Sequence, residues 1–413
     1  MRKALLATAV TAALVPAAAF ATTGYFSHGY GMKAKSMGGV GIALPQDSLA
    51  AATNPAGMAL IGNRMDLGLD WFRPDRGAEI VGNPMLSGTY DGNDASDFLI
   101  PEFGFNRMLD PNLALGISVY GNGGMNTEYT TSPFAAIGGS SPAGVDLSQL
   151  FIAPTIAWKT GGHAFGASLN LAYQRFQARG LQPFAMFSSD PANVTDRGYD
   201  TSTGWGVRVG WTGQVTPSVT LGATYQTKTQ MGKFDKYKGL FAEQGGFDIP
   251  ENYGVGVAWK AGSGLTLAAD VQQINYGDVA SVGNPVDCLF TGCQLGADNG
   301  AGFGWQNTTV YKIGASYEWS RSLTLRGGYV TLKQPIPASQ TLFNIVAPGV
   351  VENHVTLGAT WQVSNQSELT VGYMHAFENK VNGAGSIPPS MGGGEANLRM
   401  SQDSLGIAWG WKY

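Results

Sequence analysis

The chain has 413 residues, and only 13% of them are charged, against about 25% in ordinary soluble domains. Glycine is abundant at 59 residues, aromatic residues make up 11%, and the formal net charge is −4. This mildly acidic balance gives no support to nucleic-acid binding. After the first 21 residues, the sequence has no run of about 18 apolar residues, the length that a membrane helix needs. A low charged fraction without such a run is typical of strands with one apolar and one polar face.

The N-terminus has the pattern of a secretory signal peptide. Arg2 and Lys3 form a basic end, residues 4–15 are apolar, and residues 19–21 read Ala-Phe-Ala, a small-x-small cleavage site. A membrane anchor is the alternative, but the apolar part is short for one. We therefore expect residues 1–21 to be removed on export and the mature chain to begin at Thr22.

Residues 22–62 precede the first alternating segment and do not alternate themselves. Asp47-Ser48 followed by Leu-Ala-Ala-Ala-Thr predicts a short helix, and Asn54 and Pro55 suit the N-cap and first position of a second one. Ala56 completes the triplet Asn54-Pro55-Ala56. Because this part starts on the periplasmic side, we expect it to fold into the lumen as an N-terminal hatch (plug).

From residue 63 to 413 the chain alternates with a period of two, beginning with Met65, Leu67 and Leu69 against Asp66 and Asp70. Six short turn signals separate paired runs: 110–112, 160–162, 216–218, 261–264, 320–322 and 364–367. Longer loops lie between them. The pattern predicts an all-β fold, a transmembrane β-barrel of about 14 antiparallel strands with both ends on the short-turn side. A soluble sandwich, the alternative, would scatter its aromatic residues through a core.

A barrel of this width is not filled by its own side chains, so its lumen is either open or occupied. Alternation turns several charged residues inward, with mixed signs. One hypothesis is that inward cations bind a substrate carboxylate, and the candidates are Arg208, Lys228, Lys312 and Arg326. The alternative is that these residues form ion pairs that brace the hatch.

Two long loops carry apolar side chains that are costly to expose unless they bind a ligand or pack together. The candidate loop groove consists of Phe184, Met186, Phe187, Phe234, Leu240 and Phe241. Mutual packing of the loops is the alternative, and the two are compatible.

Other motifs are few. Cys288 and Cys293 predict a local disulfide in an exported protein, and with no histidine nearby they make a poor zinc site. Neither G-x-S-x-G nor H-E-x-x-H occurs, so no catalytic residue, metal or cofactor is expected. An outer-membrane lipase with a Ser/His pair on the barrel wall stays open as an alternative.

The last strand ends in alternating aromatic residues, and Gly406, Trp409, Trp411 and Tyr413 are similar to the assembly signal of outer-membrane barrels. Together with the glycine-rich start GYFSHGYGMKAKSMGGVGIALPQDSLAAATNPAGMAL, the Asn54-Pro55-Ala56 triplet and the strand count, this ending resembles the FadL family. That family comprises outer-membrane transporters for long-chain fatty acids and other hydrophobic compounds, including the TodX-like aromatic-hydrocarbon channels. One departure is Tyr413, where phenylalanine is commoner.

The resemblance implies a hatch in the barrel, a groove between extracellular loops, a tighter site inside, and sideways release through a gap at a kinked third strand. We therefore expect uptake of hydrophobic molecules across the Gram-negative outer membrane, with long-chain fatty acids as the first candidate. An aromatic-hydrocarbon channel of the same family and a general diffusion porin are the alternatives. Expected partners are the substrate, outer-membrane lipid and lipopolysaccharide, and the barrel-assembly machinery, with no nucleic acid and a monomeric state.

Overall fold

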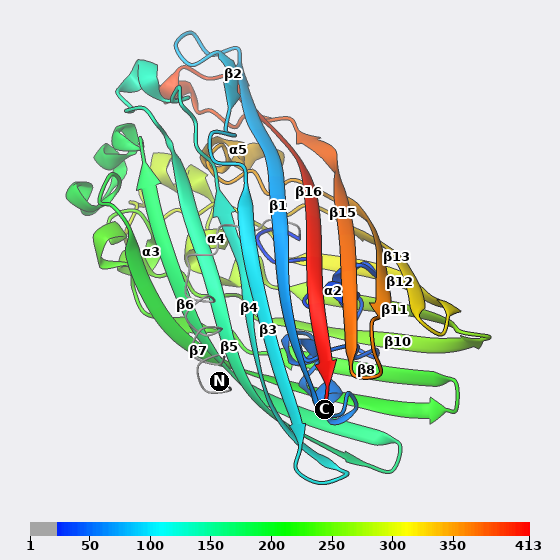
Figure 1. Ribbon diagram of the computed structural model, residues 1–413. Coiled ribbons are helices and arrows are strands. Elements are labelled where there is room, and N and C mark those ends of the chain that lie inside the picture. Colours follow the sequence, from blue (N-terminus) through cyan, green and yellow to red (C-terminus); the bar gives the residue numbers. More distant parts are fainter. Residues whose placement is uncertain (1–22) are drawn as a thin grey trace.

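The structure is a computed structural model that describes residues 23–413, so the predicted signal peptide lies outside the described residues. Fourteen long antiparallel strands of this part follow one another in chain order around a closed ring (Figure 1). They are β1 (Arg64–Val81), β3 (Phe98–Met108), β4 (Leu113–Asn126), β5 (Gly144–Thr160), β6 (His163–Arg179), β7 (Asp200–Thr216), β8 (Val219–Gln226), β10 (Asn252–Gly262), β11 (Leu265–Ile274), β12 (Thr308–Ser320), β13 (Leu323–Leu332), β14 (Asn353–Gln362), β15 (Ser367–Val381) and β16 (Glu395–Lys412).

The ring closes where β16 pairs with β1. This pairing is continuous, from Arg64 opposite Lys412 to Val81 opposite Glu395. Closure leaves no unpaired sheet edge at this junction, which a structure surrounded by lipid requires. Two short strands, β2 (Gly88–Asp91) and β9 (Gln230–Met231), extend the sheet locally but are not part of the ring. The predicted all-β barrel of about 14 strands is confirmed.

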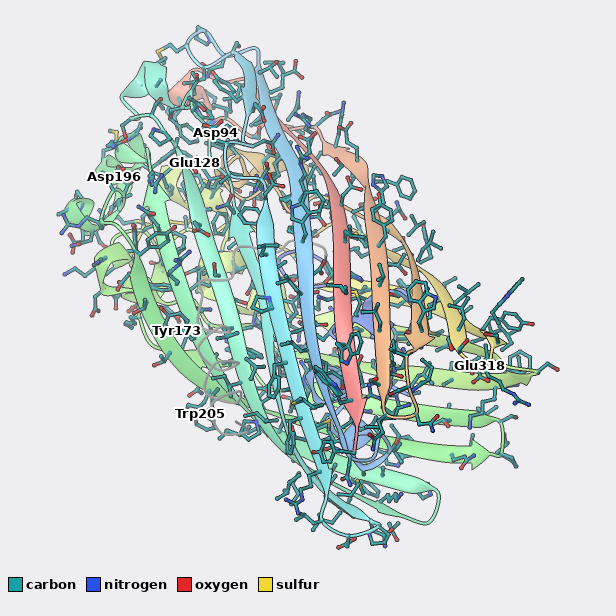
Figure 2. All side chains as sticks on the ribbon, in the orientation of Figure 1. Asp94, Glu128, Tyr173, Asp196, Trp205 and Glu318 are labelled. Atoms are coloured by element: carbon teal, nitrogen blue, oxygen red, sulfur yellow. A yellow bond between two sulfur atoms is a disulfide. The ribbon has the colours of Figure 1, made fainter. Side chains whose placement is uncertain are left out.

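The two faces of the wall differ as the alternation predicts. On β1, Asp66 and Asp70 are buried, whereas Leu67, Leu69 and Trp71 are 46%, 42% and 40% exposed. Figure 2 shows the outward side chains of Tyr173 and Trp205 projecting from the wall. Large apolar side chains that face outward on every part of a closed sheet match the lipid-facing band of a membrane barrel.

The connections alternate in length. Each of the six predicted short turns joins two ring strands, and the C-terminal end of β16 lies at the same end of the barrel (Figure 1). We call this the turn end, and the opposite end, with the seven longer connections, the loop end. Tryptophans near the turn end are Trp158, Trp211, Trp259, Trp319 and Trp361.

Helical structure is limited to short pieces. Before the barrel they are α2 (Met32–Lys35), η1 (Ala50–Ala52) and η2 (Pro55–Ala59). At the loop end they are η3 (Ala135–Ile137), η4 (Gln182–Phe187), η5 (Pro191–Asn193), η6 (Asp235–Tyr237), α3 (Ala242–Gly245), η7 (Tyr276–Asp278), α4 (Ala280–Gly283), η8 (Val286–Phe290), η9 (Ala338–Gln340), α5 (Thr341–Asn344) and η10 (Pro389–Met391). Within residues 23–413, no helix has the length and apolar character needed to cross a bilayer.

Residues 23–63, here called the N-terminal segment, contact the inner face of the wall at widely separated strands. Gly38 N donates to Thr356 Oγ1 on β14 at 2.8 Å, and Gly41 N donates to Asp270 Oδ2 on β11 at 2.8 Å. On another side of the ring, Ser48 N donates to Asp66 Oδ2 on β1 at 2.9 Å. A segment with partners around the ring lies within it.

Inward glycines allow this close approach. A Cβ atom added to Gly328 on β13 would lie 2.2 Å from Gly38 N, and one added to Gly210 on β7 would lie 1.9 Å from Asn54 Oδ1. Both distances are shorter than any non-bonded contact, so a larger residue at either position would push the N-terminal segment away from the wall. The abundance of glycine in the strands therefore has a packing reason as well as a compositional one.

Candidate functional site

The triplet Asn54-Pro55-Ala56 joins the N-terminal segment to the wall. Asn54 has an extended backbone and Oδ1 accepts from Ala56 N at 3.1 Å, so Asn54 caps η2 with Pro55 at its first position. The same side chain is 1% exposed, and its Nδ2 donates to Ile42 O at 2.7 Å and to Trp211 O on β7 at 3.0 Å. One side chain therefore caps the helix, braces the segment and bonds to the barrel.

Buried ion pairs add two further attachments. In the first, Glu368 on β15 accepts from Lys33 Nζ and, at 2.7 Å, from Arg64 Nη2, and Arg64 also bonds to Asp66. In the second, Lys35 Nζ lies 3.0 Å from Asp70 Oδ2 and 3.3 Å from Glu102 Oε2.

The seven charged side chains of these two clusters are all at least nine-tenths buried. Partners for buried charges are what make such burial tolerable, so each cluster ties the N-terminal segment to particular strands.

The predicted lumen cations have different surroundings. Arg208 donates through Nη1 to Ala52 O and, at 3.0 Å, to Thr53 O, and through Nε to Gln226. Arg326 donates to Gln46 Oε1 at 3.1 Å and to Thr360. These two arginines thus bind the N-terminal segment, which is the bracing alternative.

The two predicted lysines differ from each other. Lys312 is buried on β12, opposite Asp270 of β11, and donates to Gln272 Oε1 at 3.1 Å. The placement of Lys228 in the lumen was wrong, because β8 ends at Gln226 and Lys228 lies in the following loop. There its Nζ donates to Asp278 O at 2.8 Å.

His28 adds a titratable group inside the barrel. It is 2% exposed, its Nε2 lies 3.3 Å from Lys35 O, and its ring stacks on that of His354 with centroids 6.5 Å apart. Burial, followed by the proximity of His354 and Lys35, lowers the pKa of His28 to about 3. The imidazole is therefore neutral near pH 7.

The loop end encloses an apolar cavity of about 40 Å³, here called the loop cavity. Six phenylalanines supply much of its lining: Phe134, Phe176, Phe184, Phe241, Phe303 and Phe343. Its single polar side chain, Ser281, donates its hydroxyl to Gly246 O at 2.5 Å. No charged side chain lines it, so it is suited to apolar ligands without a charge.

Three of the six predicted groove residues, Phe184, Leu240 and Phe241, line the loop cavity. Phe234 is buried beside Phe241, with ring centroids 6.0 Å apart, and Phe187 packs on Phe290 at 5.7 Å. The placement of Met186 in the groove was wrong, since its side chain is 79% exposed and outside the cavity lining. The loops thus pack on each other and also leave a cavity.

Sequence reasoning missed the other phenylalanines of the lining. Phe303 and Phe343 come from the loops after β11 and β13. The available signal was apolar residues within glycine- and proline-rich loops, as in the stretch 341–351. Near this part, Cys288 and Cys293 are joined by a disulfide with Cα atoms 5.2 Å apart.

The wall has a break in pairing between its second and third long strands. Pairing of β3 with β4 ends at Phe103 opposite Val119, although β4 continues to pair with β5 as far as Asn126. Residues 98–102 of β3 and 120–126 of β4 therefore do not pair with each other, and we call this the β3–β4 break. It lies at the third strand of the ring, the strand for which the resemblance implied a kink.

A β-bulge accompanies this break. The register of β4 against β5 shifts between Gly121 and Gly123, which leaves Asn122 as an extra residue. The start of the N-terminal segment lies along the freed edge, with Gly124 N donating to Tyr25 O at 2.9 Å and Ser27 N to Asn122 O at 3.2 Å.

The aromatic C-terminus faces outward at the turn end. Trp411 and Tyr413 are 37% and 56% exposed, Trp409 is half-buried, and Gly406 points inward against Met32. Tyr413 Oη donates to Asn106 O at 3.0 Å. The role of this C-terminal pattern as an assembly signal stays a prediction. Within residues 23–413, no group of three histidine, cysteine or carboxylate side chains is arranged to hold a metal ion.

Comparisons with known proteins agree with this architecture. Among solved structures, the toluene transporter TodX of Pseudomonas putida has a TM-score of 0.71 at 20% identity, covering 94% of this chain and 99% of that chain. A FadL homologue of Pseudomonas aeruginosa has a TM-score of 0.70 at 16% identity, with 94% and 99% covered. The Ralstonia pickettii toluene transporter TbuX has a TM-score of 0.64 at 20% identity, again with 94% and 99% covered.

At such identities these likenesses concern the fold. No curated protein matches the chain. The family model described as "Outer membrane protein transport protein (OMPP1/FadL/TodX)" matches residues 8–410, nearly the whole sequence. The chain therefore belongs to the OMPP1/FadL/TodX family and is a bacterial outer-membrane transporter of hydrophobic compounds.

Proposed function

We propose that this transporter takes up compact, neutral hydrophobic molecules, which bind in the loop cavity and leave sideways at the β3–β4 break. The observation that carries the substrate class is the lining of the loop cavity, which is apolar and holds no charged side chain. A carboxylate placed there would lose its hydration without a cation to replace it.

The contacts of the two arginines that were expected to bind a substrate carboxylate also favour a neutral substrate. Arg208 and Arg326 donate to main-chain and amide oxygens of the N-terminal segment. A fatty-acid carboxylate would have to compete with those oxygens and release the segment. A neutral hydrocarbon needs no such exchange, and the solved relatives TodX and TbuX are described as toluene transporters.

The strength of binding also favours a compact molecule. A sixteen-carbon chain buried completely would gain roughly 10 kcal/mol at about 0.8 kcal/mol per CH₂, which makes release from a single site slow. A molecule of about seven carbons gains roughly half of that, which corresponds to a dissociation constant near the millimolar to micromolar range. Weak binding suits a transporter that must pass its cargo on.

The loop cavity must open to admit even such a molecule. Its volume is about 40 Å³, whereas a dry protein cavity that binds benzene has about 150 Å³. Leu240 and Phe343 line the cavity and are only half-buried. Rotation of these two side chains toward the outside is the smallest movement that would enlarge it.

The β3–β4 break supports sideways exit. It is the place where neighbouring ring strands lack backbone pairing over several residues of both strands, and the bulge at Asn122 holds β4 away from the regular register. A passage into the membrane at this place would lead an apolar molecule past the start of the N-terminal segment to lipid, without crossing the part of the lumen where the ion pairs of that segment lie.

Uptake of labelled toluene and labelled oleate, side by side, tests the substrate class in cells that lack their own transporter for either compound. We expect toluene uptake several-fold above that of cells without the protein and no increase for oleate. Leu240→Trp, which fills the cavity, should lower toluene uptake, whereas Met186→Trp on the exposed neighbouring loop should not. Oleate uptake without toluene uptake would instead support long-chain fatty acids.

Deletion of Asn122 tests sideways exit. Removing the extra residue restores a continuous register of β4 with β5 and removes the carbonyl that Ser27 N bonds, so that β4 is freed to pair along β3 and close the break. We expect toluene uptake to fall to background while the folded barrel remains in the outer membrane. Deletion of Asn382, an exposed residue in the loop between β15 and β16, is the control. Unchanged uptake after deletion of Asn122 would refute exit at this place.

A further inference from the structure

Arg76 connects the two sides of the β3–β4 break from a third strand. It lies on β1, points inward and is 1% exposed. Its Nη1 donates to Asn126 O at 2.6 Å and to Asn126 Oδ1 at 3.1 Å, and its Nη2 donates to Ala95 O at 2.6 Å. Asn126 ends β4, and Ala95 lies just before β3, so one guanidinium bonds to the end of β4 and to the residues that lead into β3.

The partners of Arg76 are all neutral. Its third group, Nε, lies 3.4 Å from Asn93 Oδ1, and its guanidinium carbon lies 5.8 Å from the centre of the Phe98 ring. Within residues 23–413, no carboxylate forms an ion pair with this guanidinium, and Asp75 and Asp91 act on it from farther away. A buried charge without a paired carboxylate stabilises a fold little or not at all, so what Arg76 contributes is the position of the groups it bonds.

Contacts between the strands bound the β3–β4 break on two sides, and Arg76 lies at the loop side. On the turn side, the break ends at the last β3–β4 pair, Phe103 and Val119. On the loop side, Asn93 and Glu128 form an isolated bridge, and Asp94 N donates to Glu128 O at 3.3 Å. Figure 2 shows Asp94 and Glu128 together at the loop end. The guanidinium lies just inside this bridge, where the strands begin to separate.

A second cavity, of about 140 Å³ and lined by both polar and apolar residues, begins at the same groups. Ala95, Phe98 and Asn126 line it, and so do Gln177 and Arg179, which alternate on β6 with the buried Phe176 and Ala178. Val145 lines both this cavity and the loop cavity. Val145 of β5 thus lies between the two cavities, and the groups that Arg76 holds line the second cavity next to the break.

We propose that Arg76 is a positioning residue that limits how far β3 and β4 separate, and that it thereby restricts the width of molecules that leave at the break. This inference rests on the proposed sideways exit. Two strong charge-assisted bonds to main-chain oxygens keep residue 95 and residue 126 at a fixed separation. Without them, the loop-side end of the break is held by the Asn93–Glu128 bridge with its main-chain bonds and by the bond of Thr130 to Asp94.

The test compares uptake of toluene with uptake of phenanthrene, a three-ring hydrocarbon, in cells that produce the full-length protein. Arg76→Met keeps the length and apolar packing on Phe98 but removes every donor. Arg73→Met is the matched control, because Arg73 lies on the same strand with an exposed side chain. We expect the phenanthrene-to-toluene ratio to rise several-fold in Arg76→Met and to stay unchanged in Arg73→Met, with equal amounts of heat-modifiable, folded barrel.

Arg76→Lys is a second variant in which the phenanthrene-to-toluene uptake ratio is measured. Lysine keeps the charge but lacks the planar fork that reaches both oxygens, so the ratio should rise in this variant too, by less. If Arg76→Met does not fold, Arg76→Lys carries the test alone. A folded Arg76 variant with an unchanged ratio, or with both substrates lost, overturns the proposal.

Sideways exit and the role of Arg76 can be refuted separately. If deletion of Asn122 leaves toluene uptake unchanged, sideways exit at the break is refuted. If that deletion abolishes uptake while Arg76→Met and Arg73→Met behave alike, only the role of Arg76 is refuted.

Discussion

The side-chain amide of Asn54 bonds to the main-chain carbonyl of Trp211 at 3.0 Å, and this contact joins the N-terminal segment to β7. The other end of the same amide caps η2. Capping alone is worth about 1 kcal/mol and would make the residue a local turn former. The bond to Trp211 makes it an attachment between two parts of the molecule that are far apart in sequence.

Asn54→Ala and Asn54→Asp separate these two roles. Alanine removes both the cap and the donors, whereas aspartate keeps a capping oxygen and loses the donors to Ile42 O and Trp211 O. We expect both variants to lower toluene uptake several-fold while folded protein in the membrane stays near normal. If Asn54→Asp takes up toluene like the parent and Asn54→Ala only melts at a slightly lower temperature, the residue is a cap and no more.

Glu368→Gln should loosen the N-terminal segment. The substitution leaves Lys33 buried without its carboxylate, and breaking a buried pair in this way costs about 3–5 kcal/mol. A single cysteine introduced at Ser36 should then react faster with a thiol reagent than in the parent background. Glu378→Gln on the same strand, whose ion pair with Lys380 is exposed, is the control. Equal labelling rates in the two variants would show that this cluster does not hold the segment.

Acid should loosen the same segment through His28. The pKa of His28 is lowered from its ordinary value to about 3, so the folded state excludes a proton that the released state binds below about pH 6.5. The stabilisation is therefore complete above pH 6.5 and is lost as the pH falls toward 3. Because the thiolate fraction of any cysteine falls with pH, the labelling rate at position 36 is divided by that of a free thiol at the same pH. This ratio should rise as the pH falls over this range, and less so in His28→Gln. A labelling rate that depends on pH equally in both proteins would contradict this assignment.

Deletion of Tyr413 should impair assembly. Tyr413 bonds to Asn106 O and its ring stacks on Phe105 with centroids 5.9 Å apart, which places the last aromatic residue against β3 at the turn end. If the outward aromatic residues are the signal read by the barrel-assembly machinery, the shortened chain should be made and exported but accumulate unfolded. Normal amounts of heat-modifiable barrel in the outer membrane would argue against that role.

The ring was predictable because its signals are local. Period-two alternation and short turns record, residue by residue, which side chains face lipid, as at Leu67 and Asp66. The error at Lys228 arose from extending that alternation two residues past Gln226, where the strand ends.

The sites were less predictable, because their parts meet only after the ring closes. Phe184, Phe303 and Phe343 come from three separate loops, so no local pattern joins them into one cavity. Arg76 gave no signal because the two oxygens that it bonds at 2.6 Å belong to the main chain, whose positions the sequence does not display.

The initial rate of toluene uptake, measured with that of a small polar sugar in the same cells, distinguishes a transporter of hydrophobic molecules from an open porin. The cells lack their own general porins and hydrocarbon transporters and produce the full-length protein. An apolar loop cavity above an occupied lumen predicts toluene entry several-fold above background and sugar entry at background. Sugar entry at the rate of an open porin, without a gain in toluene entry, would contradict the account.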